Sequence, residues 1–428
     1  MVILGAGLAG LSAAYHGGGN IYEKEKEIGG TCRSLKTGGY IFDFGIHVLH
    51  TQNKYVLGLL KRNPGLRNKK RSAWIYSHSV FTKYPFQANT FGLPKYIIVE
   101  CLLGFVGVLN KPKGNYYNYE DWVYANFGQG IADNFYLPYS DKFWTVNAKD
   151  LTTDWIDVRV PKPDLAQVIE GAISVQKEEF GPNAIFRYPQ RGGIQRLTEG
   201  LLKKESRIFL VKEAVNINID TKTVSFKDKT SVNYKNLIST IPLPELVRII
   251  NKVPNAVMRA AKELNYNSVL CVNLGINRKN ISSAHWIYFP EEKYAPFRIS
   301  FPENFSPFTV PKGHSSIQAE ISYSKFKPLG HRDIVEKVIR DLRKAKIIKP
   351  KDNAKLINTK AIEYAYVIYD HQRQQNLKTI NKFLRKHDIY NSGRYGSWEY
   401  QWMDDAVLDG KRAAAEAKNL IKSKKIYA

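Results

Sequence analysis

The chain has 428 residues, and its 64 Lys and Arg against 39 Asp and Glu give a formal net charge of +25 at pH 7. No apolar run reaches the roughly 20 residues of a membrane-spanning helix, so we expect no membrane insertion. The basic excess would suit nucleic acid, but no recognition motif accompanies it, and we expect no specific nucleic-acid partner.

The cysteine content indicates a reducing compartment. Cys32, Cys101 and Cys271 are widely spaced, which fits free thiols better than a disulfide framework or a metal site. A strand is predicted directly after the first Met, so we expect no signal peptide. These features predict a cytoplasmic protein without a bound metal.

The first predicted strand, residues 2–4, runs into Gly5-x-Gly7-x-x-Gly10, and a helix and a second strand ending at Glu23 follow. In this motif the first glycine makes a tight turn, the second lets backbone approach a diphosphate, and the third lets the helix pack on the strand. The acidic residue accepts hydrogen bonds from a ribose. The stretch therefore predicts a dinucleotide at the helix N-terminus.

A second glycine pair identifies the dinucleotide. Gly29-Gly30-x-x-Arg33 follows the acidic residue and resembles the second signature of FAD proteins of the glutathione-reductase and amine-oxidase type. In those proteins the backbone and the Arg approach the diphosphate, and a nicotinamide enzyme would not need the segment. We therefore expect FAD.

The remaining pattern predicts interleaved segments. Residues 139–144 are predicted to be a polar and aromatic connection, and residues 207–235 a small β meander. The expected helices cover residues 90–108, 119–136, 164–175, 192–202, 254–264, 331–344, 376–387 and 403–421. The expected strands cover residues 40–44, 74–76, 79–82, 237–240 and 365–369, and the block 269–323 is expected to be rich in strands.

This order predicts an α/β fold with a Rossmann-like FAD-binding domain of the glutathione-reductase type. We expect that domain to be discontinuous, formed by residues 1–75 with 190–240 and 390–428. A helical domain, residues 85–180, and an antiparallel sheet domain, residues 265–375, would interrupt it and bind the substrate.

Five further motifs occur in a fixed order. They are Gly45-Ile46-His47-Val48, Tyr84-Pro85-Phe86-Gln87, Gly181-Pro182-Asn183-Ala184-x-Phe186-Arg187-Tyr188-Pro189, Ile287-Tyr288-Phe289-Pro290 and Gly393-Arg394-Tyr395-Gly396-Ser397-Trp398-x-Tyr400. By these motifs the chain resembles, nearly end to end, the flavin-dependent UDP-galactopyranose mutases, particularly their eukaryotic-type branch. That family shares its FAD fingerprint with amine oxidases and protoporphyrinogen oxidases.

The resemblance implies an isomerase that interconverts UDP-galactopyranose and UDP-galactofuranose with no net redox change. Reduced flavin N5 would attack the anomeric carbon, with UDP as the leaving group. The flavin must then be held reduced, so an external reductant such as NAD(P)H is expected. The partner would be a UDP-galactose nucleotide-sugar, and a homo-oligomer is compatible with the resemblance.

The resemblance also assigns residues that act on the diphosphate and the flavin. Arg159 and Arg298 match the two diphosphate arginines, a role that suits a permanently charged group able to bind phosphate oxygens bidentately. Tyr288 and Tyr400 match tyrosines that hydrogen-bond the diphosphate. His47 matches the histidine beside flavin N5.

Other positions match the cofactor and nucleobase sites. Gly393, Arg394 and Asp404 match the cofactor side, with Asp404 at the start of a helix whose N-terminal dipole faces the flavin. The positions that match the surroundings of the uridine are Tyr84, Phe86, Gln87, Tyr139, Trp144 and Asn183. For Phe86 and Trp144, a place in the core of the helical domain is a serious alternative.

Two departures leave the base and sugar open. Ser140 stands where the eukaryotic-type motif has Asn, and Arg373 where the family usually has another diphosphate-contacting Tyr. A third arginine at the diphosphate would strengthen its binding or indicate a different substrate. The alternatives are a mutase for another NDP-hexose, an FAD-dependent oxidase of the amine-oxidase or protoporphyrinogen-oxidase type, and an inactive nucleotide-binding protein.

Overall fold

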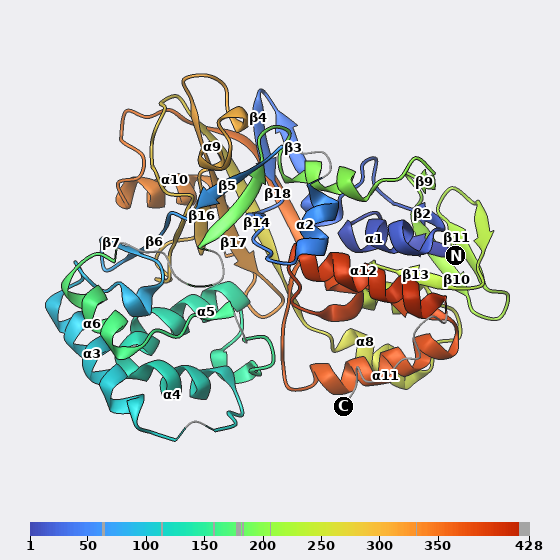
Figure 1. The fold of residues 1–428 in the computed structure, drawn as a ribbon, viewed down its shortest axis with the longest axis horizontal. Coiled ribbons are helices and arrows are strands. Elements are labelled where there is room, and N and C mark those ends of the chain that lie inside the picture. Colours follow the sequence, from blue (N-terminus) through green and yellow to red (C-terminus); the bar gives the residue numbers. More distant parts are fainter. Residues whose placement is uncertain are drawn as a thin grey trace.

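A computed structural model describes residues 1–61, 65–112, 114–156, 159–176, 181, 184–205, 207–330 and 332–418. A five-stranded parallel sheet, in the order β19-β13-β1-β2-β9, gathers segments from both ends of the chain (Figure 1). Its strands are β1 (Val2–Leu4), β2 (Asn20–Tyr22), β9 (Arg207–Phe209), β13 (Leu237–Ser239) and β19 (Ile389–Asn391). The predicted α/β fold with a Rossmann-like domain is confirmed.

Two helices from opposite ends of the chain pack together beside this sheet, α1 (Leu8–Gly17) and α12 (Met403–Ala417). The contact is so close that a Cβ on Gly410 would lie 2.1 Å from the Ala9 carbonyl oxygen. The Ser12 hydroxyl also donates to the Val407 carbonyl over 2.5 Å. The last helix was expected to run to residue 421, and its described part ends at Ala417.

A small antiparallel sheet follows, formed by β10 (Ala214–Asn218), β11 (Thr223–Phe226) and β12 (Ser231–Asn233). It is the expected meander, with one correction. The first strand of the 207–235 stretch, β9, pairs instead with β2 in the parallel sheet. Helices α7 (Leu243–Ile249) and α8 (Asn255–Lys262) come next along the chain.

A seven-stranded sheet, in the order β18-β14-β17-β16-β15-β6-β7, forms the second large unit. Its pairs are antiparallel except β15 with β6. Its strands are β6 (Ala73–Ser77), β7 (Val80–Lys83), β14 (Tyr266–Ile276), β15 (Trp286–Tyr288), β16 (Arg298–Ser300), β17 (Ser315–Tyr323) and β18 (Ala354–Val367). Of the strand expected at 365–369, residues 365–367 form the end of the much longer β18, whose polar side chains can face solvent because it lies at the edge of the sheet.

This sheet extends beyond residues 265–375, since β6 and β7 also belong to it. The division into three domains stays a prediction. Helix α10 (Ile334–Lys344) packs on the sheet through Val338 and Leu342, and it begins three residues later than expected. Shorter elements complete the order: α2 (Lys54–Leu60), α9 (Pro302–Phe305), α11 (Arg373–Lys386), β3 (Ser34–Thr37) with β4 (Tyr40–Asp43), and β5 (Leu66–Lys70) with β8 (Ile185–Pro189).

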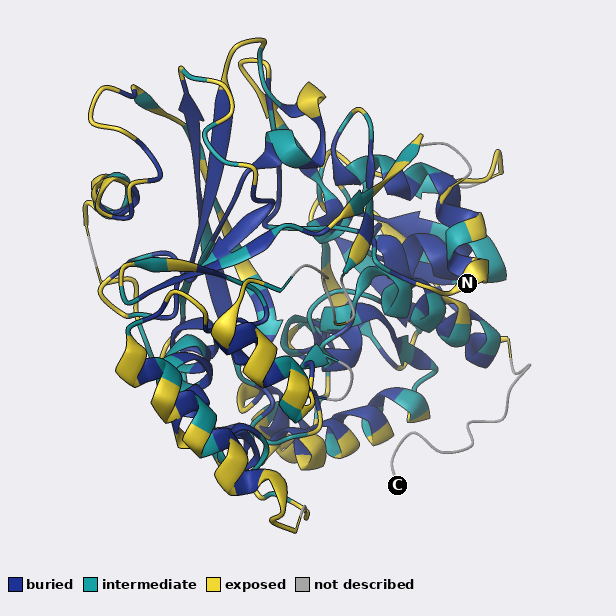
Figure 2. Ribbon diagram, turned by 60° about the vertical axis from the view of Figure 1, so that its left-hand side comes forward, coloured by how far each residue is buried: buried dark blue, intermediate teal, exposed yellow. Residues whose placement is uncertain are grey.

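A helical layer covers one end of the large sheet, with its outward faces exposed (Figure 2). It contains α3 (Lys95–Leu109), α4 (Tyr119–Ile131), α5 (Leu137–Trp144) and α6 (Leu165–Ile173). The expected connection at 139–144 was wrong, because these residues lie in α5. Phe143 and Trp144 are buried there, so packing of the apolar side of this segment overrides its polar composition.

Glycines set the spacing within this layer. A Cβ on Gly128 would lie 2.0 Å from the Gly104 carbonyl oxygen, and one on Gly130 would lie 2.3 Å from the Glu100 backbone. Helices α3 and α4 therefore meet backbone to backbone. The helix expected at 192–202 is a 3-10 helix, Ile194–Leu201. No helix among the described residues is long and apolar enough to cross a membrane.

Candidate functional site

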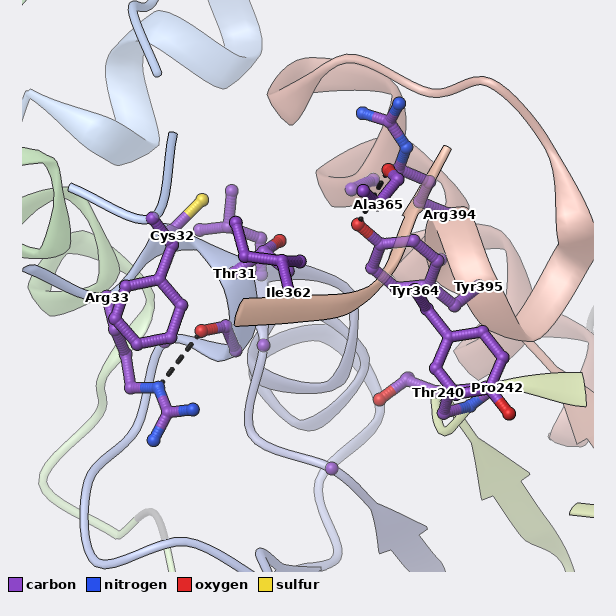
Figure 3. A pocket seen from close by; sticks show the side chains of 18 of the residues that line it. Thr31, Cys32, Arg33, Thr240, Pro242, Ile362, Tyr364, Ala365, Arg394 and Tyr395 are labelled. Carbon is purple, nitrogen blue, oxygen red and sulfur yellow. Dashed lines mark hydrogen bonds between the residues drawn. The ribbon is translucent and has the colours of Figure 1, made fainter. Parts of the chain in front are cut away.

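A cavity of about 890 Å³ lies between the parallel sheet and the seven-stranded sheet. Segments far apart in the sequence line it: the turn after β1, the loop after β4, strands β16, β17 and β18, and the 393–406 segment. Figure 3 shows Arg33 and Cys32 on one side and Arg394 and Tyr395 on the other, with Ile362 of β18 between them.

Glycines form a backbone cradle at one end of this cavity. Gly5 has a φ of +95°, and a Cβ there would lie 2.3 Å from the Thr240 hydroxyl. A Cβ on Gly30 would lie 3.1 Å from Gly7 Cα, and Gly29 donates its N–H to the Ala6 carbonyl over 2.8 Å. Two glycine loops thus approach each other with bare backbone, which suits a diphosphate.

Glu23 and Arg33 lie beside this cradle. The Glu23 carboxylate is buried and accepts hydrogen bonds from the N–H groups of Ala6, at 2.7 Å, and Glu25, at 2.9 Å. Arg33 Nε donates to the Gly30 carbonyl over 3.1 Å, and the guanidinium pairs with Glu25 at 3.1 Å. Both side chains line the cavity.

Arg394 supplies unsatisfied donors to the cavity. Its Nε and Nη2 are buried without a hydrogen-bond partner, and its guanidinium lies 4.7 Å and 4.8 Å from the ring centroids of Tyr366 and Tyr400. A buried guanidinium with free donors requires an anionic or carbonyl acceptor. Together with the glycine cradle, this residue fits the polar edge and diphosphate of a flavin nucleotide.

Gly393 also lines the cavity, whereas Gly10 and Asp404 do not. A Cβ on Gly10 would lie 2.0 Å from the Gly5 carbonyl oxygen, so Gly10 serves the packing of α1 on β1. At the start of α12 it is Met403 and Ala406 that line the cavity. The expectation that Asp404 belongs to the cofactor site stays a prediction, since the helix that it begins reaches the cavity through these two neighbours.

His47 lines the same cavity next to Gly45. Its Nδ1 lies 3.3 Å from the Gly45 carbonyl oxygen, so a proton on Nδ1 leaves Nε2 as an acceptor. Burial, with a smaller effect of the charges on Arg394 and Arg298, lowers the pKa of His47 to about 4. The imidazole is therefore neutral at neutral pH.

Arg298 is held by a carboxylate at the far end of the cavity. Its Nε and Nη2 donate to the two oxygens of Glu320 over 2.6 Å and 3.0 Å, and Glu320 also accepts from the Ile46 N–H over 3.3 Å. The pair spans adjacent positions of β16 and β17. Glu320 thus connects the arginine to the loop that carries His47.

Three tyrosines from different elements surround Arg298 and Arg394: Tyr288, Tyr366 and Tyr400. Burial raises the pKa of Tyr288, and likewise that of Tyr366, above its usual value. Both are therefore neutral phenols that can donate hydrogen bonds to an anion.

The other two arginines singled out by the sequence do not line the cavity. Arg159 donates to the Tyr400 carbonyl over 2.6 Å and lies 5.0 Å from the ring centroids of Tyr400 and Trp402, so it adjoins the cavity wall. Arg373 is buried and donates through Nε to the Trp398 carbonyl over 3.0 Å. Its expected contact with substrate stays a prediction, and in this structure its Nε and Nη2 donate to backbone.

The residues expected around a nucleobase lie in the helical layer and its border with the large sheet. Tyr84 and Tyr139 pack on Tyr288, with ring centroids 5.2 Å and 5.5 Å away. Gln87 is buried and donates to the Pro161 carbonyl over 2.6 Å. Phe86 and Trp144 are fully buried and belong to the core, as the alternative held. Asn183 lies outside the described residues.

Sequence reasoning missed Glu320, Tyr366 and Trp402, all of which line the cavity. A signal existed for Glu320, since it is the only charged residue in β17, whose other residues are mostly apolar and small. A carboxylate in a buried strand needs a partner. Tyr366 lies in an aromatic stretch. Which of these side chains face the cavity depends on the register of the strand in the sheet, which the sequence does not give.

Comparison with known proteins agrees with this geometry. A family model of flavin containing amine oxidoreductases matches residues 126–418, and a model of NAD(P)-binding Rossmann-like domains matches residues 3–62. A crystal structure of reduced UDP-galactopyranose mutase superposes with a TM-score of 0.92 at 30% identity, covering 98% of this chain and 94% of that one. The chain belongs to the UDP-galactopyranose mutase family.

Within the flavin amine oxidoreductases, this mutase family member also shares its fold with more distant enzymes. A putative protoporphyrinogen oxidase from Exiguobacterium sp. 255-15 has a TM-score of 0.74 at 14% identity over 98% of each chain. A fatty acid isomerase from P. acnes has a TM-score of 0.66 at 11% identity over 97% of each chain. These two show the fold alone, which therefore does not decide the reaction. The cofactor is FAD, and the protein is an enzyme of this flavin-dependent superfamily.

Proposed function

We propose that this enzyme is a UDP-galactopyranose mutase that interconverts UDP-galactopyranose and UDP-galactofuranose. The observation that carries the proposal is the presence of Arg298, three tyrosines and the glycine cradle in one cavity. An oxidase acting on an amine or a porphyrinogen needs no cationic site at the flavin. A nucleotide-sugar does, because its diphosphate is both the handle and the leaving group.

In this proposal Arg298 binds the diphosphate, and Glu320 keeps its guanidinium in one orientation. Tyr288, Tyr366 and Tyr400 donate hydrogen bonds to the same group. Arg159 donates to the Tyr400 carbonyl and so orients this tyrosine toward the same group. Binding the leaving group stabilises its developing charge as the bond to the sugar breaks.

When bound in its reduced form, FAD supplies the nucleophile for the anomeric carbon. The neutral His47 would offer an acceptor nitrogen to the cavity without adding a positive charge that would compete with the sugar cation. The proposed reaction also requires that water be kept away from the reacting carbon. An external reductant such as NAD(P)H keeps the flavin reduced, since the isomerisation itself consumes no electrons.

The test is a turnover assay with reduced enzyme and UDP-galactofuranose, followed by chromatography of the nucleotide-sugars. UDP-galactopyranose should accumulate, and oxidising the flavin should stop its formation. A reduced, FAD-loaded enzyme that forms no UDP-galactopyranose but consumes oxygen steadily with an amine would establish the oxidase instead. Turnover of a different NDP-hexose only would revise the substrate and keep the reaction class.

A matched pair of variants separates the diphosphate site from general effects of removing an arginine. Arg298→Ala should weaken UDP binding at least about 100-fold, because one charge-assisted bidentate contact is worth roughly 3 kcal/mol. Arg278 forms the same kind of fork with Asp352, at 2.9 Å and 2.8 Å, away from the cavity. Arg278→Ala should therefore leave UDP binding unchanged.

A further inference from the structure

Asp409, on helix α12, lies behind the segment that carries Arg394 into the cavity. Its side chain is 9% exposed and lies outside the cavity lining. Four donors of the 392–401 segment converge on one of its carboxylate oxygens, Oδ2. They are the Gly393 N–H at 2.7 Å, the Ser397 hydroxyl at 2.8 Å, the Gln401 side-chain amide at 3.1 Å and the Ser392 hydroxyl at 3.4 Å. A single carboxylate thus holds a whole turn of the chain.

The carboxylate of Asp409 is ionised in these surroundings. Its other oxygen, Oδ1, accepts a hydrogen bond from Arg412 Nε over 2.7 Å. Burial opposes the charge, but Arg412 and the hydrogen bonds from Gln401, Gly393 and Ser397 keep the pKa of Asp409 below its usual value. Each hydrogen bond from the segment is therefore made to a charged acceptor, and such bonds are stronger than those between neutral groups.

The backbone of the 392–401 segment needs contacts of this kind to keep its shape. Gly393 has a φ of +81°, and Trp398, a bulky residue, has a φ of +56°. Left-handed backbone at a bulky residue persists only where the surrounding structure fixes it. Asp409 fixes the segment from α12, and Arg373 fixes it from α11 through the Trp398 carbonyl.

Arg394 is connected to Asp409 through both its backbone and its side chain. The preceding residue, Gly393, donates its N–H to Asp409. At the other end, Arg394 Nη1 donates over 3.4 Å to the carbonyl of Gln401, whose side chain also donates to Asp409. Arg394 lines one side of the cavity (Figure 3), and its Nε and Nη2 are buried there without a partner among the described residues. A shift of the segment would therefore move these two donors.

We propose that Asp409 is a positioning residue for the flavin, because it fixes the 392–401 segment and thereby places the donors of Arg394 at the cofactor. The inference rests on the assignment of Arg394 to the cofactor and does not depend on which sugar the enzyme converts. Charge close to a flavin sets its electronic properties, and a guanidinium favours the reduced, anionic form over the oxidised one. Asp409 therefore affects both the affinity for FAD and its reduction potential without touching it.

The sign of the change in potential separates positioning from a direct effect of charge. Removing a negative charge from this region would by itself favour the reduced flavin and raise the potential. Displacing Arg394 has the opposite effect, because the reduced flavin then loses a nearby cation. Asp409→Asn keeps the size of the side chain but not its charge, so it should lower the potential if Asp409 acts through Arg394.

The test measures the FAD affinity of the apoproteins and the reduction potential of the FAD-loaded enzymes, both without substrate. Asp409→Asn should weaken binding of oxidised FAD about tenfold. It should lower the potential by about 30 mV, which corresponds to a further tenfold loss of affinity for reduced FAD. The loss is partial because Gln401 also donates to Glu399 over 3.0 Å. Arg394→Met should lower the potential at least as much, and adding Asp409→Asn to that variant should lower it no further.

Glu416→Gln is the matched control. Glu416 lies two turns further along α12, its side chain is 7% exposed, and it pairs with Arg412 and Arg385 at 2.6 Å and 2.7 Å. These partners belong to the same buried network as Asp409 but lie outside the 392–401 segment. Denaturant unfolding should therefore show a comparable loss of stability in both variants, while Glu416→Gln keeps the FAD affinity and the potential of the wild type.

Ser397→Ala covers the case in which Asp409→Asn does not fold, since it removes one donor and leaves the carboxylate in place. It should lower the potential by about 9 mV or more, a twofold loss of affinity for reduced FAD. An unchanged or raised potential in these two variants would overturn the proposal. So would an unchanged potential in Arg394→Met, or an equal shift in Glu416→Gln. A wild type without mutase turnover would overturn the proposed function and leave this inference standing.

Discussion

Arg298 and Glu320 form a bidentate ion pair across β16 and β17, with both side chains lining the cavity and Nε to Oε2 at 2.6 Å. The same carboxylate accepts from the Ile46 N–H at 3.3 Å. One buried group thus orients the cation expected to bind the diphosphate and anchors the loop expected to meet the flavin. The two halves of the site are joined through Glu320.

Replacing Glu320 by Gln should lower the free energy of unfolding by about 3 kcal/mol, because it leaves a buried guanidinium without its counter-charge. Denaturant unfolding of the two proteins measures this difference. Asp352→Asn is the control, since it removes the carboxylate from the Arg278 pair, whose arginine is 29% exposed. Water can solvate that arginine, so the loss there should be about 1 kcal/mol or less. Equal losses in both variants would contradict a special cost for the cavity pair.

His47 should make stability depend on pH. An unfolded imidazole takes up a proton near pH 6.5, whereas burial lowers the folded pKa of His47 to about 4. The unfolded state therefore binds more protons in this window, and stability falls as pH drops from about 6.5 to about 4.

The His47→Gln variant removes this contribution, so its stability should fall less between pH 7 and pH 5, by on the order of 1–2 kcal/mol. Denaturant unfolding at the two pH values measures the difference. Part of the pH dependence should remain, because burial also lowers the pKa of His16, His50 and His285. His314→Gln, at an exposed site, should match the wild type. A His47→Gln variant with the full wild-type slope would contradict this assignment.

Gly7 and Gly10 should respond differently to alanine. At Gly7 the φ is −74°, and an added Cβ would have Gly30 Cα at 3.8 Å as its nearest neighbour, so the fold should tolerate it. That methyl would occupy the cradle and should weaken FAD binding about tenfold or more. At Gly10 the Cβ would lie 2.0 Å from a backbone oxygen, which should destabilise the apoprotein by about 3 kcal/mol.

Flavin titration of the refolded apoproteins and their thermal unfolding separate these two effects. A Gly7→Ala variant that binds FAD like the wild type would contradict the cradle. A Gly10→Ala variant as stable as the wild type would contradict the tight packing of α1 on β1.

Arg373 should matter for stability and not for the substrate. Its guanidinium donates to the Trp398 carbonyl and lies 3.9 Å from the Tyr369 ring centroid. Arg373→Met should cost about 2–3 kcal/mol by leaving that carbonyl without a donor. UDP affinity, measured by calorimetry on the folded variant, should change less than about threefold. A 100-fold loss of affinity would restore the sequence-based expectation that this arginine contacts the diphosphate.

Local sequence patterns predicted the elements whose chemistry is set within a few residues. The Gly5-x-Gly7-x-x-Gly10 turn, the Gly29–Gly30 approach and the parallel strand at 237–239 all occur as expected. Segment 139–144 was misassigned because its helix depends on burying Phe143 and Trp144, a contact that composition does not contain. The long strand β18 was only partly found for the same reason, since its partner β14 lies some ninety positions away.

The sequence by itself determined the cofactor class, because backbone approach to a diphosphate needs glycines at fixed spacing, and spacing is local. It also determined the family, because several separate motifs occur along the chain in the same order as in that family. Only the tertiary structure decided which charged residues reach the cavity. Arg298 and Arg394 line it, while Arg159 adjoins it and Arg373 is turned to backbone. The direction of a side chain depends on strand register and on the partners that burial demands, and both are set by residues far away in the sequence.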